Sequence, residues 1–230
     1  MKNLVVLTGA GISAESGIST FRDANGLWEG HDIMEVASPE GWKKNPELVN
    51  TFYNARRAQL KTVAPNLAHL ILADLEQYFN VTIITQNVDN LHERAKSTNV
   101  IHLHGELNKV RPVTTDSISI TWEHDLKITD THNDIQLRPH IVWFGEAVPM
   151  LEKAIEITQK ADVLLIIGTS MQVYPAASLY EFAPTNCPIY YIDVNPPTTY
   201  VNHHRITTIQ NLASKGLAEI KEKLIVFAAK

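Results

Sequence analysis

The sequence has a single cysteine, Cys187, among 230 residues. One cysteine excludes an internal disulfide framework and a zinc site built from several thiolates. The chain also has no excess of basic residues, because 20 lysines and arginines face 25 aspartates and glutamates and the net charge is -5. This balance gives no electrostatic indication of a nucleic-acid partner.

Long apolar runs are missing as well, and none approaches the roughly 20 residues that a membrane-spanning helix needs. Met1 leads within three residues into an apolar run, without the pattern of a secretory signal peptide. We therefore expect a cytoplasmic protein with no membrane partner. The hydrophobic content of 44% and charged content of 20% are ordinary for a globular chain of this length.

Short apolar runs alternate with helix-like stretches. Residues 4–8, 81–85, 163–167 and 189–193 are almost continuously apolar and rich in β-branched residues, as strands covered on both faces should be. Helices are expected at residues 66–79, 151–160, 176–182 and 212–227. Alternating strands and helices predict an α/β fold with a doubly wound, Rossmann-like parallel sheet.

Two stretches break this rhythm. Residues 21–61 contain no strand-like run but a good helix at 47–60, and residues 105–139 are polar and only weakly strand-like. We expect them to form a small inserted lobe, with the larger lobe at about 1–20, 62–104 and 140–230, all in one catalytic domain. Crevices between lobes are favoured ligand sites.

Residues 9–14, GAGISA, follow the first predicted strand and satisfy G-x-G-x-x-(G/A). Small residues let the backbone approach a pyrophosphate at a helix N-terminus. The alternative is a tight turn that needs glycine for steric reasons. A dehydrogenase would show a second strand ending in an acidic residue about 20 positions on; the sequence there, STFRDANGLW, is no strand, which disfavours hydride transfer.

Five ordered blocks resemble the sirtuin family: GAGISAESGISTFRD (9–23), TQNVDNLHERA (85–95), HLHGEL (102–107), LRPHIVWFGE (137–146) and GTSMQVYPAA (168–177). The resemblance spans essentially the whole chain and is greatest to bacterial members that remove succinyl and malonyl groups. It implies NAD-dependent removal of succinyl, malonyl and also acetyl groups from protein lysines. The implied products are nicotinamide and O-acyl-ADP-ribose.

Polar residues end the strand predicted at 81–85. Gln86, Asn87 and Asp89 can bind a nicotinamide amide or ribose hydroxyls at this sheet edge, but Asn87 and Asp89 can equally cap the next helix. The resemblance implies that Gln86 and Asn87 lie near the ribose and Asp89 near the nicotinamide, with Asn87 and Asp89 taking part in catalysis.

His102 lies in a strand predicted at residues 100–103 and His104 directly follows it, so the two histidines should face the same side. Either can act as a base near neutral pH or bind the backbone structurally. The resemblance implies that His104 is the general base, and we take His102 as structural.

The resemblance also implies a set of cofactor contacts. Phe21 would shield the reactive sugar face and Arg22 would contact the phosphates, although ordinary packing and a surface ion pair are alternatives. At Asp193, family members often carry asparagine. The full set is Gly9, Ala10, Gly11, Ile12, Ala14, Glu15, Phe21, Arg22, Trp28, Gln86, Asn87, Val88, Asp89, Gly168, Thr169, Ser170, Asp193, Val194, Asn195 and Ala213.

An acyl pocket is indicated by Tyr53 and Arg56, which lie at i and i+3 on one helix face. A phenol and a guanidinium together can receive a carboxylate, although a surface arginine is the common alternative. The resemblance implies that this pair binds acidic acyl chains and that Ala37 widens the pocket. We expect Arg57 to be solvent-exposed. Substrate peptide contacts are expected at Val142, Phe144 and Gly145.

The chain departs from most sirtuins, which bind a structural zinc through two cysteine pairs in the small lobe. Pro112 stands where a cysteine is expected, and residues 129–134 occupy the region of the second pair. We expect no metal and a small apolar core instead, from Val113, Ile118, Ile120, Trp122, Leu126 and Ile128. Two rival functions remain on the same scaffold: an NAD-dependent ADP-ribosyltransferase or hydrolase, and an NAD- or ADP-ribose-sensing module. We expect a monomer.

Overall fold

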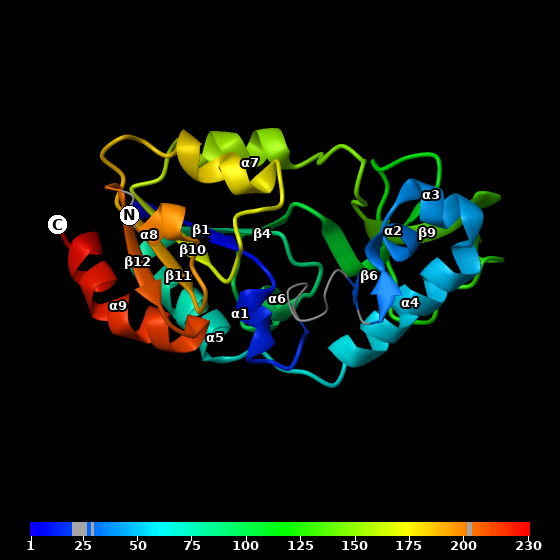
Figure 1. Ribbon diagram of the computed structural model, residues 1–230, viewed down its shortest axis with the longest axis horizontal. Helices are drawn as coiled ribbons and strands as arrows, with labels where there is room; N and C mark the ends of the chain where they lie inside the picture. Colours follow the sequence, from blue (N-terminus) through cyan, green and yellow to red (C-terminus); the bar gives the residue numbers. More distant parts are fainter. Residues whose placement is uncertain (20–26, 29, 202–203) are drawn as a thin grey trace.

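The computed structural model describes residues 1–19, 27–28, 30–201 and 204–230. The chain forms two lobes side by side along its longest axis (Figure 1). In the described part of the chain, no helix is both long enough and apolar enough to cross a membrane.

The larger lobe is built on a parallel sheet (Figure 1). Its strands lie in the order β12 (Ile206–Gln210), β11 (Ile189–Asp193), β10 (Val163–Ile167), β1 (Lys2–Thr8), β4 (Phe79–Thr85) and β5 (Val100–His102). The predicted parallel α/β sheet is therefore confirmed. The chain runs outward from β1 through β4 to β5, and then restarts at β10 on the other side of β1. Ligands bind at such a reversal point, outside the carboxyl ends of the strands.

Helices cover both faces of this sheet, as the apolar runs predict. One face packs against α5 (Leu67–Asp74) and α9 (Ala213–Ala228), and the other against α7 (Leu151–Thr158) and the 3₁₀ helix η3 (Ala176–Phe182). Figure 1 shows α7 above the sheet and α5 and α9 below it.

Two predicted helices differ from the structure. The helix predicted at 66–79 ends at Asp74, followed by the short 3₁₀ helix η2 (Leu75–Gln77), and Phe79 already begins β4. Residues 176–182 form a 3₁₀ helix rather than an α-helix. The start of α5 is set by Asn66, whose side chain accepts a hydrogen bond from the Ala68 amide.

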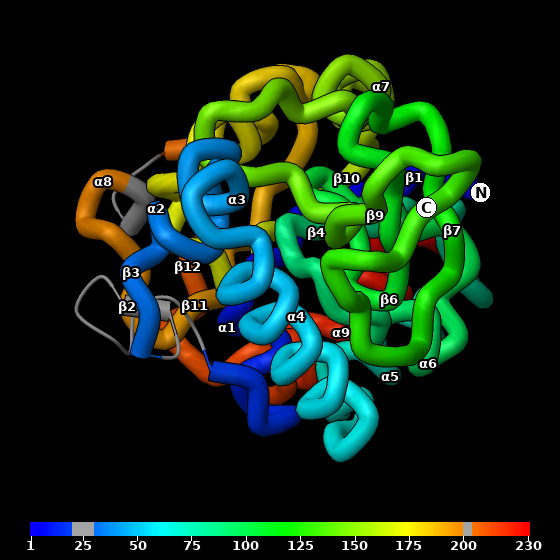
Figure 2. Tube along the Cα trace, turned by 90° about the vertical axis from the view of Figure 1, so that its right-hand side faces the viewer, coloured from blue at the N-terminus to red at the C-terminus, as the bar shows by residue number. Residues whose placement is uncertain are grey.

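The small lobe contains the short strands β2 (Leu27–Trp28) and β3 (His31–Asp32) and the helices α2 (Ile33–Val36), α3 (Pro39–Lys44) and α4 (Pro46–Leu60). Its antiparallel sheet has the order β7 (Ile120–Thr121), β6 (Gly105–Pro112), β9 (Ile135–Ile141) and β8 (Thr131–His132). The caps of α3 and α4 are Ser38 and Asn45, each followed by a proline at the first helical turn. Figure 2 views this lobe end-on, with α3 and α4 beside β6 and β9.

The apolar core of the small sheet is smaller than predicted. Leu126 is 2% exposed and packs with Val110 and Leu137, with Ile120 and Trp122 partly buried against them. The predicted members Val113, Ile118 and Ile128 are wrong, because about two fifths of each is exposed. None of the three lies in a strand, so the alternation of side chains within a strand does not apply to them.

The lobes are joined where β5 leads into β6. Gly105 begins β6 with a φ of 81°, and a Cβ there would lie 2.0 Å from the His140 carbonyl oxygen, so only glycine fits. The Val142 amide donates to the His104 carbonyl oxygen at 2.9 Å across the same joint. Two further helical turns, α1 (Gly11–Ala14) and α6 (Leu91–Arg94), follow β1 and β4 at this end of the sheet.

Candidate active site between the lobes

A cavity of about 800 Å³ lies between the lobes, at the carboxyl ends of β1, β4, β10 and β11. Such a volume suits a large organic ligand. Most of the residues predicted for the site line it. From the larger lobe these are Gly9, Ala10, Gly11, Ala14, Gln86, Asn87, Val88, Asp89, His104, Gly168, Thr169, Ser170, Asp193, Val194, Asn195 and Ala213. The predicted substrate contacts Ala37, Tyr53, Arg56, Val142, Phe144 and Gly145 also line it.

Two glycine-containing motifs pack directly against each other at the floor of the cavity. The Gly11 amide donates to the Gly168 carbonyl oxygen at 2.8 Å, and the Gly9 amide donates to Ile167 at 3.0 Å. A Cβ on Gly11 would lie 2.7 Å from the Gly168 Cα, so side chains are excluded from this contact. The helix that follows, α1, has only four residues. Close approach of the backbone, rather than a long helix dipole, is therefore what this loop offers a ligand.

Three polar side chains form a connected cluster above this floor. The Asn87 amide nitrogen donates to Ser13 Oγ at 3.1 Å, and the Ser13 hydroxyl donates to Asp89 Oδ2 at 2.9 Å. Burial raises the pKa of Asp89, while bonds from the Leu91 amide and from Ser13 oppose the shift. Since Asp89 Oδ1 accepts from the Leu91 amide at 3.1 Å, this carboxylate also caps the turn that follows. Both interpretations of Asp89, capping and cavity lining, thus apply.

A second polar group lies toward β11. The Gln86 side chain donates to Thr169 Oγ1 at 3.1 Å, and Asp193 Oδ1 accepts from the Asn195 amide at 2.8 Å. Ala213, at the start of α9, lines the same end of the cavity. Amide, hydroxyl and carboxylate groups are therefore spread along the cavity floor beneath an opening between the lobes.

His104 lies where the larger lobe meets the small one. Its Nδ1 is 3.0 Å from the Gln86 carbonyl oxygen, which can only accept a hydrogen bond, so Nδ1 carries the hydrogen and Nε2 holds the lone pair of the neutral ring. Burial lowers the pKa of His104, and the bond to Gln86 partly opposes this. The ring is therefore held as a neutral base on the cavity wall.

His102, by contrast, is held by bonds to protein groups at both nitrogens. Its Nδ1 is 3.0 Å from the Asn87 carbonyl oxygen and its Nε2 is 2.7 Å from Glu93 Oε1. The Glu93 carboxylate raises the pKa of His102 against the effect of burial. His102 does not line the cavity, which agrees with the structural role predicted for it.

The far end of the cavity lies against α4. Tyr53 is fully buried there, and its hydroxyl accepts from Trp143 Nε1 at 3.1 Å. Burial raises the pKa of Tyr53, so the phenol stays protonated. Arg56 lies one turn further along and its guanidinium carbon is 5.7 Å from the Phe52 ring centroid. The two predicted pocket residues thus line one cavity, and Ala37 lines it as well.

Trp143 is fixed by an arginine and a glutamate behind the pocket. The Arg138 guanidinium lies 3.3 Å from the centre of the Trp143 ring and donates to Glu146 at 2.6 and 3.1 Å. Glu146 also accepts from the Trp143 amide at 2.8 Å. This network holds the indole, and through it the Tyr53 hydroxyl, in one orientation.

Some predicted residues are not brought to the cavity. Ile12 is fully buried in the core, and Glu15 binds the Ser214 amide and hydroxyl at the start of α9 instead. Phe21 and Arg22 lie outside the described residues, and the Trp28 side chain is not described.

The expectation for Arg57 is wrong. Its side chain is 3% exposed and donates to backbone carbonyls inside the small lobe. Arg57 follows Arg56 on the helix and so lies on the neighbouring face. That face is covered by residues far along the sequence, since Arg57 donates to the carbonyl oxygens of Leu107 and His124.

Several lining residues were not predicted. Ser13 is the clearest, since it links Asn87 to Asp89, and its place in the GAGISA block was the available signal. Gln172 and Tyr174 line the rim in the block that follows Gly168, but an exposed tyrosine gives no pattern by itself. Asn211 and Leu212, just before α9, also line the cavity.

No cluster of three or more histidine, cysteine, aspartate or glutamate side chains suited to a metal ion occurs among the described residues. Cys187, the one cysteine of the chain, is buried in the core of the larger lobe.

Comparisons with known proteins agree with this architecture. A family model described as Sir2 family matches residues 9–175. An NAD-dependent protein deacylase of Helicobacter pylori (strain ATCC 700392 / 26695) is 56% identical over 230 residues, covering 100% of both chains. A crystal structure of a Sir2 homolog–NAD complex aligns with a TM-score of 0.84 at 39% identity, over 99% of this chain and 90% of that one. A Sir2–p53 peptide–NAD+ structure aligns with a TM-score of 0.78 at 28% identity, over 97% and 93%.

Proposed function

The chain belongs to the Sir2 family, and on this premise we propose that it is an enzyme that removes acyl groups from lysine side chains of proteins while consuming NAD. The family match, the relative named NAD-dependent protein deacylase and the Sir2 structures with NAD and peptide support the reaction class. The observation that carries the proposal is the shared cavity, which holds a neutral histidine at its middle and a tyrosine–arginine pair at one end.

The donor set of the cavity fits NAD. Backbone approach at Gly9 to Gly11 suits a pyrophosphate, and carboxylate, amide and hydroxyl groups at Asp89, Asn87 and Ser13 suit ribose hydroxyls and a carboxamide. Asp193 and Ala213, at the other end, suit the adenosine side. When bound, NAD supplies the ribose carbon that the acyl oxygen attacks, with nicotinamide as leaving group.

His104 is the proposed general base. Its Nδ1–H is held by the Gln86 carbonyl, so Nε2 can take a proton from a ribose hydroxyl and pass it on. A lowered pKa keeps this nitrogen unprotonated at neutral pH. Asn87 and Asp89 are proposed to orient the same sugar through their link to Ser13.

We assign a preference for succinyl and malonyl groups to Tyr53 and Arg56. The terminal carboxylate of such a chain needs a cation and a hydrogen-bond donor at a fixed distance from the lysine amide. Arg56 offers the cation and Tyr53 a phenol that burial keeps protonated. Ala37 leaves room for the chain, since a larger side chain there would reach into the cavity.

The substrate peptide is proposed to lie along residues 142–145. The amides of Val142, Trp143 and Phe144 already donate to His104, Glu146 and Ala37. A peptide strand would therefore pair with the carbonyl side of this segment rather than with those amides. Main-chain pairing of this kind accepts many sequences.

The test is incubation with NAD and matched peptides carrying succinyl-, malonyl- or acetyl-lysine, followed by mass spectrometry. We expect free-lysine peptide, nicotinamide and O-acyl-ADP-ribose, with higher kcat/KM for the acidic acyl groups. Arg56→Met should reduce succinyl removal by about tenfold or more, and acetyl removal far less, because an ion pair with a buried carboxylate is lost.

Lys43→Met serves as a control, because Lys43 is an exposed cation in the last turn of α3, in the same lobe. Equal losses for all acyl groups in Arg56→Met would contradict the pocket assignment. ADP-ribose attached to protein, without deacylated peptide, would favour an ADP-ribosyltransferase instead.

A further inference from the structure

Helix α4 carries a second pair of polar residues, Asn54 and Arg57, one position on from Tyr53 and Arg56. Each pair has i, i+3 spacing, so the two pairs occupy adjacent faces of the helix. Tyr53 and Arg56 line the cavity. Asn54 and Arg57 lie on the neighbouring face, against residues 123–126 and β6, where Arg57 is 3% exposed.

Asn54 binds one residue of a distant segment through both of its amide atoms. The Leu126 amide donates to Asn54 Oδ1 at 2.9 Å, and Asn54 Nδ2 donates to the Leu126 carbonyl oxygen at 3.1 Å. This is the hydrogen-bond pattern of a strand partner, supplied by a side chain. The Leu126 side chain is anchored at the same time among Val110 and Leu137.

Arg57 extends the contact in two directions. Its Nη1 donates to Asn54 Oδ1 at 2.7 Å and to the His124 carbonyl oxygen at 3.3 Å, while Nε donates to the Leu107 carbonyl oxygen at 3.0 Å. The Leu107 amide in turn donates to the Val88 carbonyl oxygen at 2.8 Å. A connected set of bonds therefore runs from α4 through β6 to the loop that carries Asn87 and Asp89.

The tethered stretch, residues 122–130, consists of turns and extended chain between β7 and β8. Lys61 adds a further contact, donating to the Glu123 carbonyl oxygen at 2.7 Å. Except for Trp122, Leu126 and Asp130, its side chains are exposed. The backbone of residues 123–126 is bound by Asn54 and Arg57 of α4 and by Lys61. Farther out, Trp122, Ile128 and Asp130 bond to residues of β6 and β9.

A structural zinc, which the family resemblance implies for this lobe, does not fit here. The lobe holds no cysteine, and its described residues offer no cluster of metal-ligating side chains. We propose that Asn54 and Arg57 take the structural role that the zinc has in other sirtuins, because they bind residues 123–126 to α4. They thereby act as positioning residues that keep the side chains of Tyr53 and Arg56 directed into the acyl pocket. The effect on acyl selectivity rests on the function proposed above.

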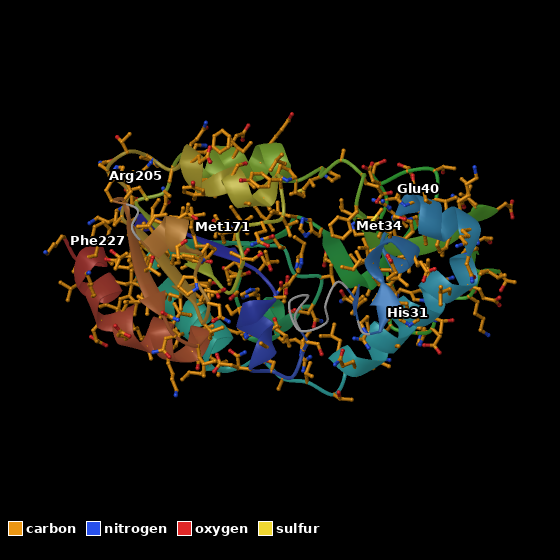
Figure 3. The ribbon with its side chains drawn as sticks, in the orientation of Figure 1. His31, Met34, Glu40, Met171, Arg205 and Phe227 are labelled. Carbon is orange, nitrogen blue, oxygen red and sulfur yellow. The ribbon has the colours of Figure 1, made fainter. Side chains whose placement is uncertain are left out.

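Two variants and a matched control test this. Asn54→Ala removes both bonds to Leu126, whereas Asn54→Asp keeps the oxygen that accepts from Leu126 and from Arg57. Arg205→Met is the control, because Arg205 also donates to two backbone carbonyls, of Ala183 and Pro184. It lies at the far end of the larger lobe from the small one (Figure 3).

The first measurement is hydrogen–deuterium exchange of residues 122–130 without NAD. We expect Asn54→Ala to exchange about tenfold faster or more there, because both bonds to Leu126 are lost. Asn54→Asp keeps the acceptor for the Leu126 amide but loses the Nδ2 donor, so its rate should lie between those of Asn54→Ala and the wild type. Arg205→Met should leave this segment unchanged. Exchange in Asn54→Ala equal to that of the wild type would overturn the tether, whether or not the protein is a deacylase.

The second measurement separates positioning from mere stability. In Asn54→Ala, KM for a succinyl-lysine peptide should rise severalfold, while KM for NAD and the kinetics on an acetyl-lysine peptide stay near wild type. Asn54→Asp, which keeps one of the two bonds to Leu126, should bring the succinyl KM partway back toward the wild-type value. Equal losses on both peptides would overturn the positioning role. A wild-type protein without NAD-dependent deacylation would instead contradict the proposed function, and the exchange result would still decide the tether.

Discussion

At the scale of single residues, the placement of one hydrogen atom determines what His104 can do. The Gln86 carbonyl fixes the hydrogen on Nδ1, so the lone pair of this cavity-lining ring is on Nε2. The side chain of Gln86 also donates to Thr169 Oγ1. Gln86 therefore connects His104, through its carbonyl, to Thr169 on the other side of the cavity floor.

Replacing His104 by alanine should lower NAD-dependent deacylation by a factor of about 10² to 10⁴, the usual contribution of a general base. Binding of ADP-ribose should change little, because the contacts along the cavity floor remain. Rapid-quench kinetics and calorimetric titration measure the two effects. Undiminished turnover in His104→Ala would rule out this residue as the base.

The pH profile provides an independent check. Burial lowers the pKa of His104, and the base works only when neutral. Activity should therefore persist below the ordinary histidine pKa of about 6.5 and fall as the pH drops through the lowered value. A profile of kcat/KM whose acid limb lies at or above pH 6.5 would contradict this placement.

At the scale of elements, two buried histidines join α5 and α6 beneath the site. The His69 and His92 ring centroids are 4.8 Å apart, and His92 Nε2 is 3.1 Å from Thr8 Oγ1. Burial lowers the pKa of His69 to about 4 and that of His92 well below its ordinary value. Both rings are therefore neutral in the folded protein.

This pair should make the fold sensitive to acid. Between pH 6.5 and 4 the unfolded chain binds protons at these rings that the folded protein does not, so stability is full above pH 6.5 and falls toward pH 4. His69→Gln keeps a capping-box residue at this position of α5 but cannot titrate. The unfolding free energy of His69→Gln should therefore fall less steeply on acidification than that of the wild type. The two slopes should differ by at most about 1.4 kcal/mol per pH unit, the effect of one proton.

Urea unfolding at pH 7.5, 5.5 and 4.5 measures the slopes, with His124→Gln as a control because the His124 side chain is exposed. If His69→Gln lost stability with acid as steeply as the wild type, the buried pair would not be responsible.

The strands show which elements a sequence pattern reveals. β1, β4, β10 and β11 were predicted because strands buried on both faces are continuously apolar. β12 was missed: Ile206 and Ile209 enclose two threonines, and this edge strand buries few side chains. The split of the helix predicted at 66–79 was missed as well, because Leu75 is an apolar, buried residue that also fits the core-facing side of a continuous helix.

The site was predictable to a similar degree and for a related reason. Residues that follow strand ends, such as Asp89 and His104, are grouped by the topology of the sheet, which the chain pattern indicates. The exposure of Arg57 depends instead on residues 123–126, about 70 positions away, which helical periodicity cannot reveal. Ile12 and Glu15 do not line the cavity, and a motif alone does not say which of its side chains turn away from a cavity.

At the scale of the whole molecule, the cavity requires both lobes, since His104 belongs to one and Arg56 to the other. The small lobe is held by backbone-directed hydrogen bonds from α4, by the Val110, Leu126 and Leu137 core, and by the larger apolar cluster that includes Phe52 and Trp143. If these contacts suffice, a chelator should leave the thermal midpoint and succinyl-peptide activity unchanged. A fall of several degrees, or stoichiometric zinc in the purified protein by elemental analysis, would contradict this.

The bonds from Asn54 and Arg57 end on peptide groups, and the side chains of residues 123–125 point to solvent. Substitutions at positions 123 and 124 therefore preserve the hydrogen bonds of the tether, whereas Asp125 carries a charge that acts on Arg57. Over evolutionary time these two exposed positions should diversify while Asn54 and Arg57 should not, so orthologues should vary most at the surface of the segment on which the lobe depends.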